Sequence, residues 1–347
     1  MIAPLTPQFA SDNNAGVCPE AWAALVAANA GHAPGYGGDD WTKAASDAIR
    51  GAFATDCEVH FVFNGTAANA LALSCICRSS DAVVCHAMAH INVDECGAPE
   101  FFSGGAKLLT ADTPLAKLTP AAVAALAVTP HDEHSSRPRA LALTQATELG
   151  TLYSGEELGE LCTMAHARGM KVQMDGARFA NAVASLACAP ADISWRAGVD
   201  VLCLGGTKNG LPFGEAIVFF DKSLAEEFAR RRKQGGQLAS KMRFLAAPWL
   251  GVLEDGAWLR HAAHANAMAR RLAAAIGHLS GTRLLAPVEA NSVFVDVPEP
   301  AIAAVRANGW RFYNFVGATG VRFMCSWDTT AENVDALVAA LRIALQS

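Results

Sequence analysis

The stretch 59-VHFVFNGTAANALALSCI-76 places a short β-rich run directly before an Ala- and Leu-rich helical run. We predict a buried strand over 59–63 and a helix over 67–76, because short apolar runs and helical periods favour these elements. Further strand candidates follow, separated by helical runs, at 82–85, 140–144, 172–174, 199–204 and 216–220. This alternation is typical of an α/β domain with a largely parallel sheet.

The residues beyond 220 predict a second, smaller unit. An Ala-rich helical stretch from about 238 to 279 follows the sheet region and is expected to join two domains. The tail then alternates strand and helix, in the manner of a small α+β domain, at 290–297, 301–308, 321–325 and 331–344. We therefore expect a large domain over residues 1–240, and a connecting helix with a small C-terminal domain over residues 241–347.

Composition excludes several classes of protein. The 347 residues are 52% hydrophobic and carry a formal charge of -6, which indicates a globular chain without a basic surface for nucleic acid. No apolar run reaches the ~18 residues of a membrane span. Residues 1–11 show no secretory signal, so we expect a cytoplasmic protein. The 10 cysteines form no C-x-x-C pair and mostly lie in apolar runs, as reduced core thiols do.

Three polar motifs follow predicted strands, at the sheet edge where ligands bind in open α/β folds. They are 64-NGTA-67, 174-MDGAR-178 and 205-GGTKNG-210. The first could hold a phosphate on helix N–H groups, or be an ordinary turn with Thr66 as N-cap. The second would deliver Asp175 and Arg178 to the crevice, or only pair them with each other. The third lacks the Gly-Lys-Ser/Thr order of a nucleotide triphosphate loop.

Taken together, the three motifs predict a pyridoxal phosphate site. That cofactor needs a phosphate cradle, an acid facing its pyridine nitrogen, and a lysine that forms a Schiff base with its aldehyde. Gly65 and Thr66, Asp175, and Lys208 supply these groups in that order. Asp175 matters physically because a carboxylate beside the ring nitrogen keeps it protonated, and the cofactor can then accept electrons.

The ordered motifs also resemble those of a known enzyme family, the low-specificity L-threonine aldolases. The matching segments cover nearly the full chain and are 11-SDN-13, 36-YGGD-39, 65-GTAAN-69, 89-AH-90, 95-ECG-97, 175-DGAR-178, 181-NA-182 and 207-TKNG-210. The resemblance implies an aspartate-aminotransferase-like fold, which is fold type I of the pyridoxal phosphate enzymes. It also implies cleavage of a β-hydroxy-α-amino acid to glycine and an aldehyde, by a homotetramer built as a dimer of dimers.

The resemblance assigns roles at the cofactor. Lys208 resembles the Schiff-base lysine, Asp175 the partner of the ring nitrogen, and Gly65 and Thr66 the phosphate cradle. His90 resembles the imidazole that stacks on the cofactor ring. It is the one histidine that motifs place there, so it either accepts the β-hydroxyl proton or only stacks, and both interpretations stay open.

The resemblance also assigns residues to the substrate. Ser11, Arg178 and Arg322 resemble the groups that hold its carboxylate, a task that suits the two parallel hydrogen bonds of an arginine. Arg178 would also lie against the cofactor, and Tyr36 falls in a motif near the substrate. Lys241 could reach the phosphate from outside these motifs. Arg322 has the weakest alignment, because only the segment around it supports the match.

The sequence departs from the common family pattern at 144-TQATE-148, where many members show Glu-Asn-Thr-His-Asn. Thr147 therefore stands in the place of a second imidazole. Asn209 also replaces the usual residue after the lysine. These changes leave the cofactor groups intact but bear on substrate preference and on the handedness at the β-carbon.

Other readings stay open at this point. The same cofactor groups would serve a phenylserine aldolase, a racemase, a β-eliminating lyase or an aminotransferase, and a non-catalytic protein that binds a phosphorylated ligand is a further alternative. We expect no metal site. The group around His86 and His90 lacks tetrahedral ligand spacing, and His261 and His264 have helical spacing that favours a helix surface or an interface.

Overall fold

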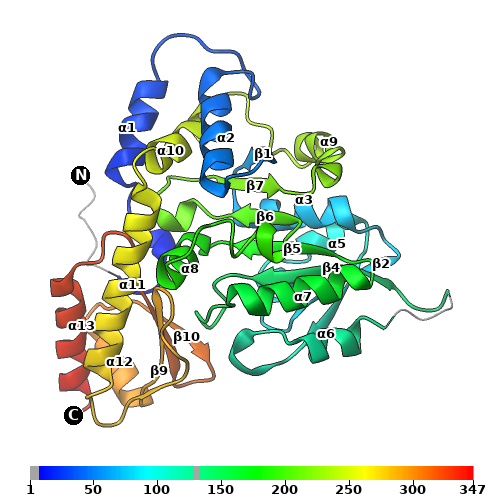
Figure 1. Ribbon diagram of the computed structural model, residues 1–347. Helices are drawn as coiled ribbons and strands as arrows, with labels where there is room; N and C mark the ends of the chain where they lie inside the picture. Colours follow the sequence, from blue (N-terminus) through cyan, green and yellow to red (C-terminus); the bar gives the residue numbers. More distant parts are fainter. Residues whose placement is uncertain (1–7, 129–132, 347) are drawn as a thin grey trace.

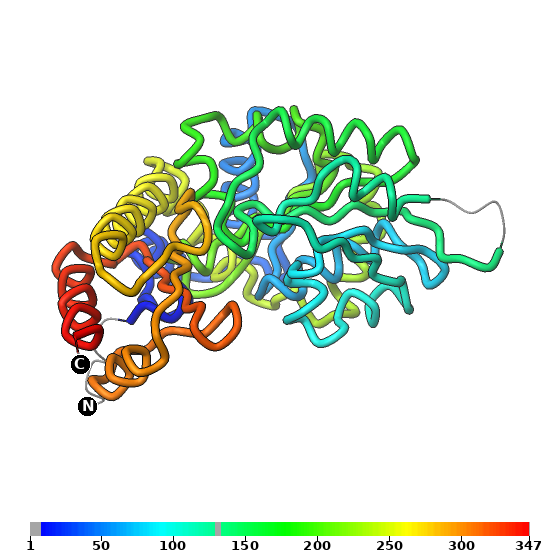
Figure 2. Tube along the Cα trace, turned by 90° about the horizontal axis from the view of Figure 1, so that it is seen from below, coloured from blue at the N-terminus to red at the C-terminus, as the bar shows by residue number. Residues whose placement is uncertain are grey.

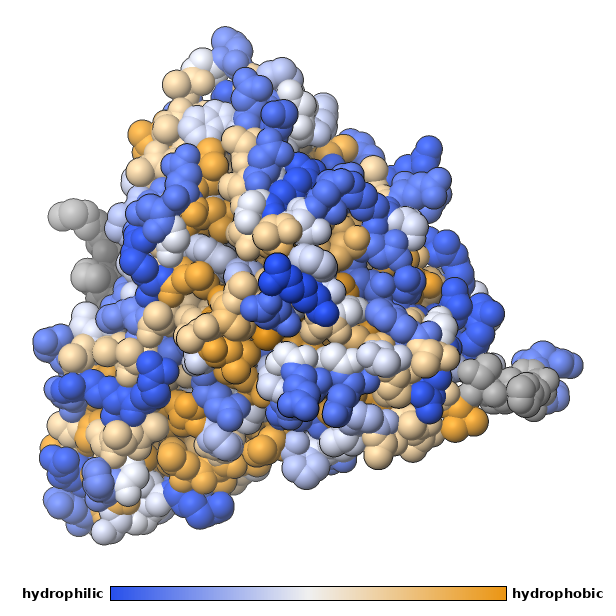
Figure 3. All heavy atoms as spheres, viewed as in Figure 1, coloured by the Kyte–Doolittle hydropathy of each residue, from blue (hydrophilic) through white to orange (hydrophobic). Residues whose placement is uncertain are grey.

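The structure is a computed structural model that describes residues 8–128 and 133–346. Residues 1–7, part of the segment in which we expect no secretory signal, lie outside the described residues. Among the described residues, no helix is long and apolar enough to cross a lipid bilayer. Figure 3 shows hydrophilic and hydrophobic residues interspersed over one face of the molecule.

A seven-stranded sheet forms the centre of the larger part (Figure 1). Its order is β1-β7-β6-β5-β4-β2-β3, and β7 is antiparallel to both of its neighbours while the remaining pairs are parallel. The strands are β1 (Glu58–Val62), β2 (Asp81–His86), β3 (Lys107–Ala111), β4 (Arg137–Thr144), β5 (Lys171–Gly176), β6 (Val201–Leu204) and β7 (Glu215–Phe219). The predicted, largely parallel sheet is confirmed, and β3 is a strand that the sequence did not reveal.

Helices cover both faces of this sheet because its strands are apolar on both sides. Along β4, Leu141 and Leu143 face one core and Ala140 and Ala142 face the other. The first core is completed by α2 (Asp40–Phe53), α7 (Gly155–Ala167), α8 (Phe179–Leu186) and α10 (Arg243–Leu253), and the second by α3 (Gly65–Ile76) and α9 (Phe228–Gln234). The other helices of this part are α1 (Pro19–Ala28), α4 (His90–Val93), α5 (Ala98–Ser103) and α6 (Pro120–Leu126).

A four-stranded antiparallel sheet forms the smaller part. Its order is β10-β11-β9-β8, from β8 (Arg283–Leu284), β9 (Ser292–Asp296), β10 (Tyr313–Val316) and β11 (Gly320–Met324). Helices α12 (Glu299–Ala307) and α13 (Ala331–Ala344) pack with it around a separate core. In Figure 2 this part, orange to red, lies beside the cyan and green part.

The helical stretch predicted over 238–279 is two helices, and the prediction of one continuous run is wrong. Helix α10 ends at Leu253 and α11 (Ala257–Ile276) begins after Gly256, whose φ of +72° suits glycine and breaks the helix. Helix α11 runs along both parts (Figure 1), with its first residues in the first core and its last residues in the core of the smaller part. The division at residue 240 stays a prediction.

Candidate active site

Two neighbouring cavities open at the edge of the large sheet where its parallel strands end. The larger holds about 510 Å³ and the smaller about 340 Å³. His90, Asp175 and Lys208 line both of them. Three of the residues that the sequence places at the cofactor therefore meet between the two cavities, although 118 positions separate His90 from Lys208.

Lys208 sits on a short 3-10 helix, η4 (Thr207–Asn209), directly after β6. Gly205 permits this placement, because a Cβ there would lie 2.4 Å from the Ala177 carbonyl oxygen. Burial, together with the Arg178 charge, lowers the pKa of Lys208. No described residue forms a hydrogen bond or ion pair with its amine. The site thus holds an amine that is more readily uncharged, and so more nucleophilic, than a surface lysine.

Asp175, at the end of β5, belongs to a buried polar network. The Asn69 side-chain amide donates 2.8 Å hydrogen bonds both to Asp175 Oδ2 and to Glu95 Oε1, and Asn69 Oδ1 accepts from Gln173. The other oxygen of Asp175 accepts the Ala177 N–H. This arrangement fixes the carboxylate in one orientation.

His90 is tied to the same network. Its Nδ1 lies 2.8 Å from Glu95 Oε1, and its Nε2 lies 3.5 Å from Asp94 Oδ2. The hydrogen bond to Glu95 raises the pKa of His90, so the imidazole holds a proton more tightly than usual. Both ring nitrogens therefore face carboxylates.

The start of α3 lines the smaller cavity with Gly65 and Thr66. Asn64, and not Thr66, is the N-cap, since its side chain accepts the Ala67 N–H at 2.9 Å. The first N–H groups of a helix have no partner within it, so those of Gly65 and Thr66 remain for an anion. A Cβ at Gly65 would meet no atom within 4 Å, so packing within the chain does not explain this glycine.

A buried carboxyl group also lines the smaller cavity. Glu215, on β7, accepts the Gly206 N–H at 2.6 Å. Burial raises its pKa to about 7. A protonated Glu215 would not repel an anion in this cavity. No motif in the sequence indicated this residue.

Arg178 pairs with Asp12 and not with Asp175. Its Nε and Nη2 donate to the two Asp12 oxygens at 2.7 and 2.8 Å, and Asn291 also donates to Asp12. Burial alone would raise the pKa of Asp12, but the charge and hydrogen bonds of Arg178, together with the Lys208 charge and the Asn291 hydrogen bond, outweigh burial and lower that pKa. The edge of Arg178 suited to a carboxylate is therefore already occupied, although the residue lines the larger cavity.

Arg322, on β11, has a guanidinium group that is more available to a ligand than that of Arg178. Its Nη2 donates to the Ala10 carbonyl oxygen at 3.3 Å, while the buried Nε has no hydrogen-bond partner within residues 8–128 and 133–346. The rings of Tyr313 and Phe315 lie 5.8 and 5.0 Å from its guanidinium carbon. Burial lowers the pKa of Arg322 to about 10, so it stays charged at neutral pH. Ser11 lines the same cavity.

Two of the predicted residues do not reach either cavity within this chain. Tyr36 is 55% exposed and lies beside the Lys233 amine. Lys241 is exposed as well. Neither contributes to the lining of the two cavities.

The segment 144–148 lies at the end of β4. The Thr147 hydroxyl is 2.8 Å from that of Thr151 and 3.3 Å from the Leu115 carbonyl oxygen, so it is already engaged. Glu148 lines the larger cavity. Its Oε1 accepts hydrogen bonds from the Thr144 hydroxyl at 3.0 Å and from the backbone N–H of His90 at 3.1 Å. Its Oε2 is buried and has no hydrogen-bond partner among the residues that the structure describes.

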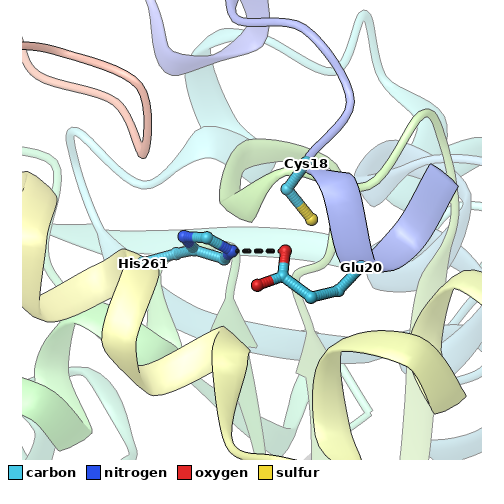
Figure 4. Close-up of side chains that lie close together, drawn as sticks. All are labelled: Cys18, Glu20 and His261. Carbon is cyan, nitrogen blue, oxygen red and sulfur yellow. Dashed lines mark hydrogen bonds and ion pairs between the residues drawn. The ribbon is translucent and has the colours of Figure 1, made fainter. Parts of the chain in front are cut away.

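A cluster outside the cavities brings together Cys18, Glu20 and His261 (Figure 4). Their ligand atoms lie within 4.8 Å of one another, and His261 Nε2 is 2.9 Å from Glu20 Oε2. Arg260 places a cation 3.7 Å from the other Glu20 oxygen, which disfavours a metal ion. The absence of a metal site stays a prediction. The cluster abuts the lysine segment, because the Cys18 N–H donates to the Gly210 carbonyl at 2.8 Å.

Sequence reasoning gave no role to several residues of the site. They are Asp12, Asn69, Glu95, Glu148 and Glu215. Asp12, Asn69 and Glu95 lie in segments that match the family motifs, and Glu148 lies in the divergent segment 144-TQATE-148. Asn69 follows Gly65 by four positions on α3, a spacing that places both on one helix face. Glu148 and Glu215 carry no comparable signal.

Comparisons with known proteins agree with this geometry. Residues 8–300 match the family model described as beta-eliminating lyase. The chain is 58% identical to the low specificity L-threonine aldolase of Pseudomonas aeruginosa, over 98% of each chain. A solved threonine aldolase of Leishmania major is 28% identical, with a TM-score of 0.92 over 99% of this chain and 100% of that one.

A more distant match concerns the fold alone. Serine palmitoyltransferase of Sphingomonas wittichii is 14% identical and covers 97% of this chain and 87% of its own, with a TM-score of 0.74. Together with the mostly parallel sheet, these structures confirm the predicted α/β, fold-type-I architecture.

Proposed function

Since the chain belongs to the beta-eliminating lyase family, and within it to the low specificity L-threonine aldolases, we propose that it cleaves β-hydroxy-α-amino acids. It is a carbon–carbon lyase that converts L-threonine, L-allo-threonine and related substrates to glycine and an aldehyde. The observation that carries this proposal is the position of Lys208, an unpartnered amine of lowered pKa between two cavities that share Asp175.

The residues present fit pyridoxal phosphate. The donor set comprises a nucleophilic amine on Lys208, an oriented carboxylate on Asp175, and a helix start at Gly65 where a Cβ would project into open space. These would hold the aldehyde side, the ring nitrogen and the phosphate, respectively. When bound, the cofactor supplies an electron sink for the bond cleaved at the substrate α-carbon.

The protein's own residues would orient the substrate and hold charge. Arg322 would bind the substrate carboxylate, since its Nε is unpartnered and its charge is held close to the cavity by the surrounding rings. Arg178, fixed by Asp12, would add positive potential without moving. Asp175, held by Asn69, would keep its negative charge facing the ring nitrogen without reorganising during the reaction.

A product assay tests the proposed function. Purified protein with added pyridoxal phosphate should release glycine and acetaldehyde from L-threonine and L-allo-threonine, and glycine and benzaldehyde from phenylserine. Racemised amino acid, keto acid without glycine, or an absorption spectrum that shows no bound cofactor would each support one of the other readings and contradict ours.

We also propose a homotetrameric, cytoplasmic enzyme that takes free amino acids and has no nucleic-acid or membrane partner. The assembly is supported by the family resemblance and by the exposure of Tyr36 and Lys241, which reach no cavity of their own chain. Light scattering coupled to size exclusion tests the assembly, and a dimer or monomer with full activity would contradict it.

A further inference from the structure

The larger cavity contains several groups able to take a proton, and cleavage needs one for the β-hydroxyl. Lys208 is committed to the cofactor in our proposal. The other proton-accepting or hydroxyl side chains that line the cavity, apart from serine and threonine, are His90, Asp94, Glu148, Asp175 and Tyr313. We compare them by what each already binds.

Four of these groups are engaged or exposed. Both oxygens of Asp175 accept hydrogen bonds, from Asn69 and from the Ala177 N–H. Both nitrogens of His90 face carboxylates, Asp94 and Glu95, so neither is left open to a substrate hydroxyl. The side chain of Asp94 is 81% exposed and faces His90, and Tyr313 is 53% exposed.

Glu148 differs from all of them. Hydrogen bonds from the Thr144 hydroxyl and from the backbone N–H of His90 hold its Oε1 and so fix the carboxyl group. Its buried Oε2 has no hydrogen-bond partner in the described part of the chain. An acceptor oxygen that is held in place but unpartnered is suited to receive a proton from a ligand. The neighbouring Thr147, which replaces the second imidazole of the family pattern, has its hydroxyl bound to Thr151.

We propose that Glu148 accepts the proton of the substrate β-hydroxyl when the Cα–Cβ bond breaks, an inference that rests on the proposed function. The O–H bond breaks and its electron pair becomes the second bond of the aldehyde C=O. The electron pair of the Cα–Cβ bond remains with the α-carbon, which then takes up a proton to become that of glycine. Glu148 ends the step protonated and releases the proton to solvent before the next turnover.

Burial raises the pKa of Glu148 to about 7, and the negative charge of Asp175 contributes in the same direction. A base with a pKa close to the operating pH is both sufficiently basic and sufficiently ionised. The titratable groups that surround it come from five neighbouring segments and are Cys85, His90, Tyr153, Asp175 and Arg178. Because Glu148 is active when deprotonated, kcat should fall as the pH drops below about 7.

Glu148→Gln tests the proposal without removing the fold contacts. The amide oxygen can still accept from Thr144 and from the His90 N–H, while the other atom becomes an NH₂ group that cannot take a proton. Glu100→Gln is the matched control, because Glu100 Oε2 is likewise buried and unpartnered but lies on α5, outside both cavities.

We measure two reactions of each variant loaded with pyridoxal phosphate. For Glu148→Gln, kcat for L-threonine cleavage should fall by about 10²-fold or more, the usual contribution of a positioned base. Exchange of the glycine α-proton in D₂O, followed by NMR, should stay at the wild-type level, because glycine has no β-hydroxyl. The acid limb of the pH profile should disappear, and Glu100→Gln should match wild type throughout.

Two further readouts need no turnover. The affinity for pyridoxal phosphate should be the same in Glu148→Gln and wild type. The infrared C=O band of protonated carboxyl groups that titrates near pH 7 should lose intensity in Glu148→Gln but not vanish, since burial also raises the pKa of Glu215 to about 7.

The other outcomes overturn the proposal. If Glu148→Gln lost threonine cleavage and glycine exchange to the same extent, Glu148 would only support the cofactor site. If Glu148→Gln cleaved L-threonine at the wild-type rate, Glu148 would have no role in the reaction. A wild-type protein that exchanges glycine protons but cleaves no β-hydroxy amino acid would refute the proposed function, and this inference with it.

Discussion

The two sheets contribute to the active site in different ways. The large sheet supplies Asp175 and Lys208 from strand ends within a hydrogen-bonded network that also holds Asn69 and Glu95. The small sheet supplies Arg322 from β11, whose neighbour β10 is exposed along its length. In the proposed mechanism, bond cleavage would depend on a rigid network, whereas substrate binding would depend on a side chain with few fixed partners.

The largest expected effect lies on the large-sheet side, at Lys208. Lys208 is the only lysine among the described residues that line the two cavities, so in Lys208→Ala cleavage should fall by about 10⁴-fold or more, as for the loss of a nucleophile. Pyridoxal phosphate could still bind through the start of α3. The absorption spectrum and the glycine assay check this, and a variant whose cofactor band still responds to added amino acid would show that another residue holds the cofactor.

The next effect is expected within the network itself. Asp175→Asn keeps the size of the side chain but removes the negative charge beside the ring nitrogen, and it sets an NH₂ group against one of the two N–H donors, Asn69 or Ala177. We therefore expect kcat to fall by about 10²- to 10³-fold, the scale of an oriented electrostatic group. Steady-state kinetics measures kcat and KM separately. A rise in KM with unchanged kcat would place Asp175 in substrate binding and remove the contrast between the two sheets.

A substitution on the small sheet should change KM and not kcat. Arg322→Lys keeps the charge but loses the pair of parallel hydrogen bonds to a carboxylate, so KM for L-threonine should rise by about 10- to 100-fold with kcat retained. Val316→Ala, on the same hairpin but outside the lining of both cavities, serves as control. A fall in kcat with unchanged KM would assign Arg322 to the cleavage step.

The smallest effect is expected at His90. In His90→Phe a ring can still stack on the cofactor, and the cost of altered stacking is about 0.5–1.5 kcal/mol, so kcat should drop by no more than about 10-fold. Turnover measured with saturating cofactor checks this. A loss of about 10²-fold or more would instead identify His90 as the proton acceptor.

The sequence predicted those parts of the site that depend on local order along the chain. Lys208 and Asp175 follow buried strands, and Gly65 begins a helix, so strand and helix patterns were sufficient to place them at one sheet edge. The fork between Arg178 and Asp12 could not be predicted, because it joins residues 166 positions apart through the folding of the chain end. Because Asp12 already occupies Arg178, Arg322 becomes the better candidate for binding the substrate carboxylate.

Other differences also arise from tertiary structure. A run of Ala, Leu and Arg residues gives no sign that Gly256 adopts a positive φ, and so one predicted helix became α10 and α11. Glu148 and Glu215 look like surface carboxylates in the sequence. Only their burial in the folded protein raises the pKa of each to about 7.

The exposed strand β10, which pairs with the largely buried β11, has a practical consequence for altering this enzyme. Tyr313 is 53% exposed and Phe315 36%, and both line the larger cavity without belonging to either core cluster. Exposed positions tolerate replacement with small changes in stability, usually within about 0.5 kcal/mol. Mutant libraries at these two positions would therefore change the shape of the cavity entrance at little cost to folding, which makes the hairpin the natural starting point for directed evolution of new substrate scope.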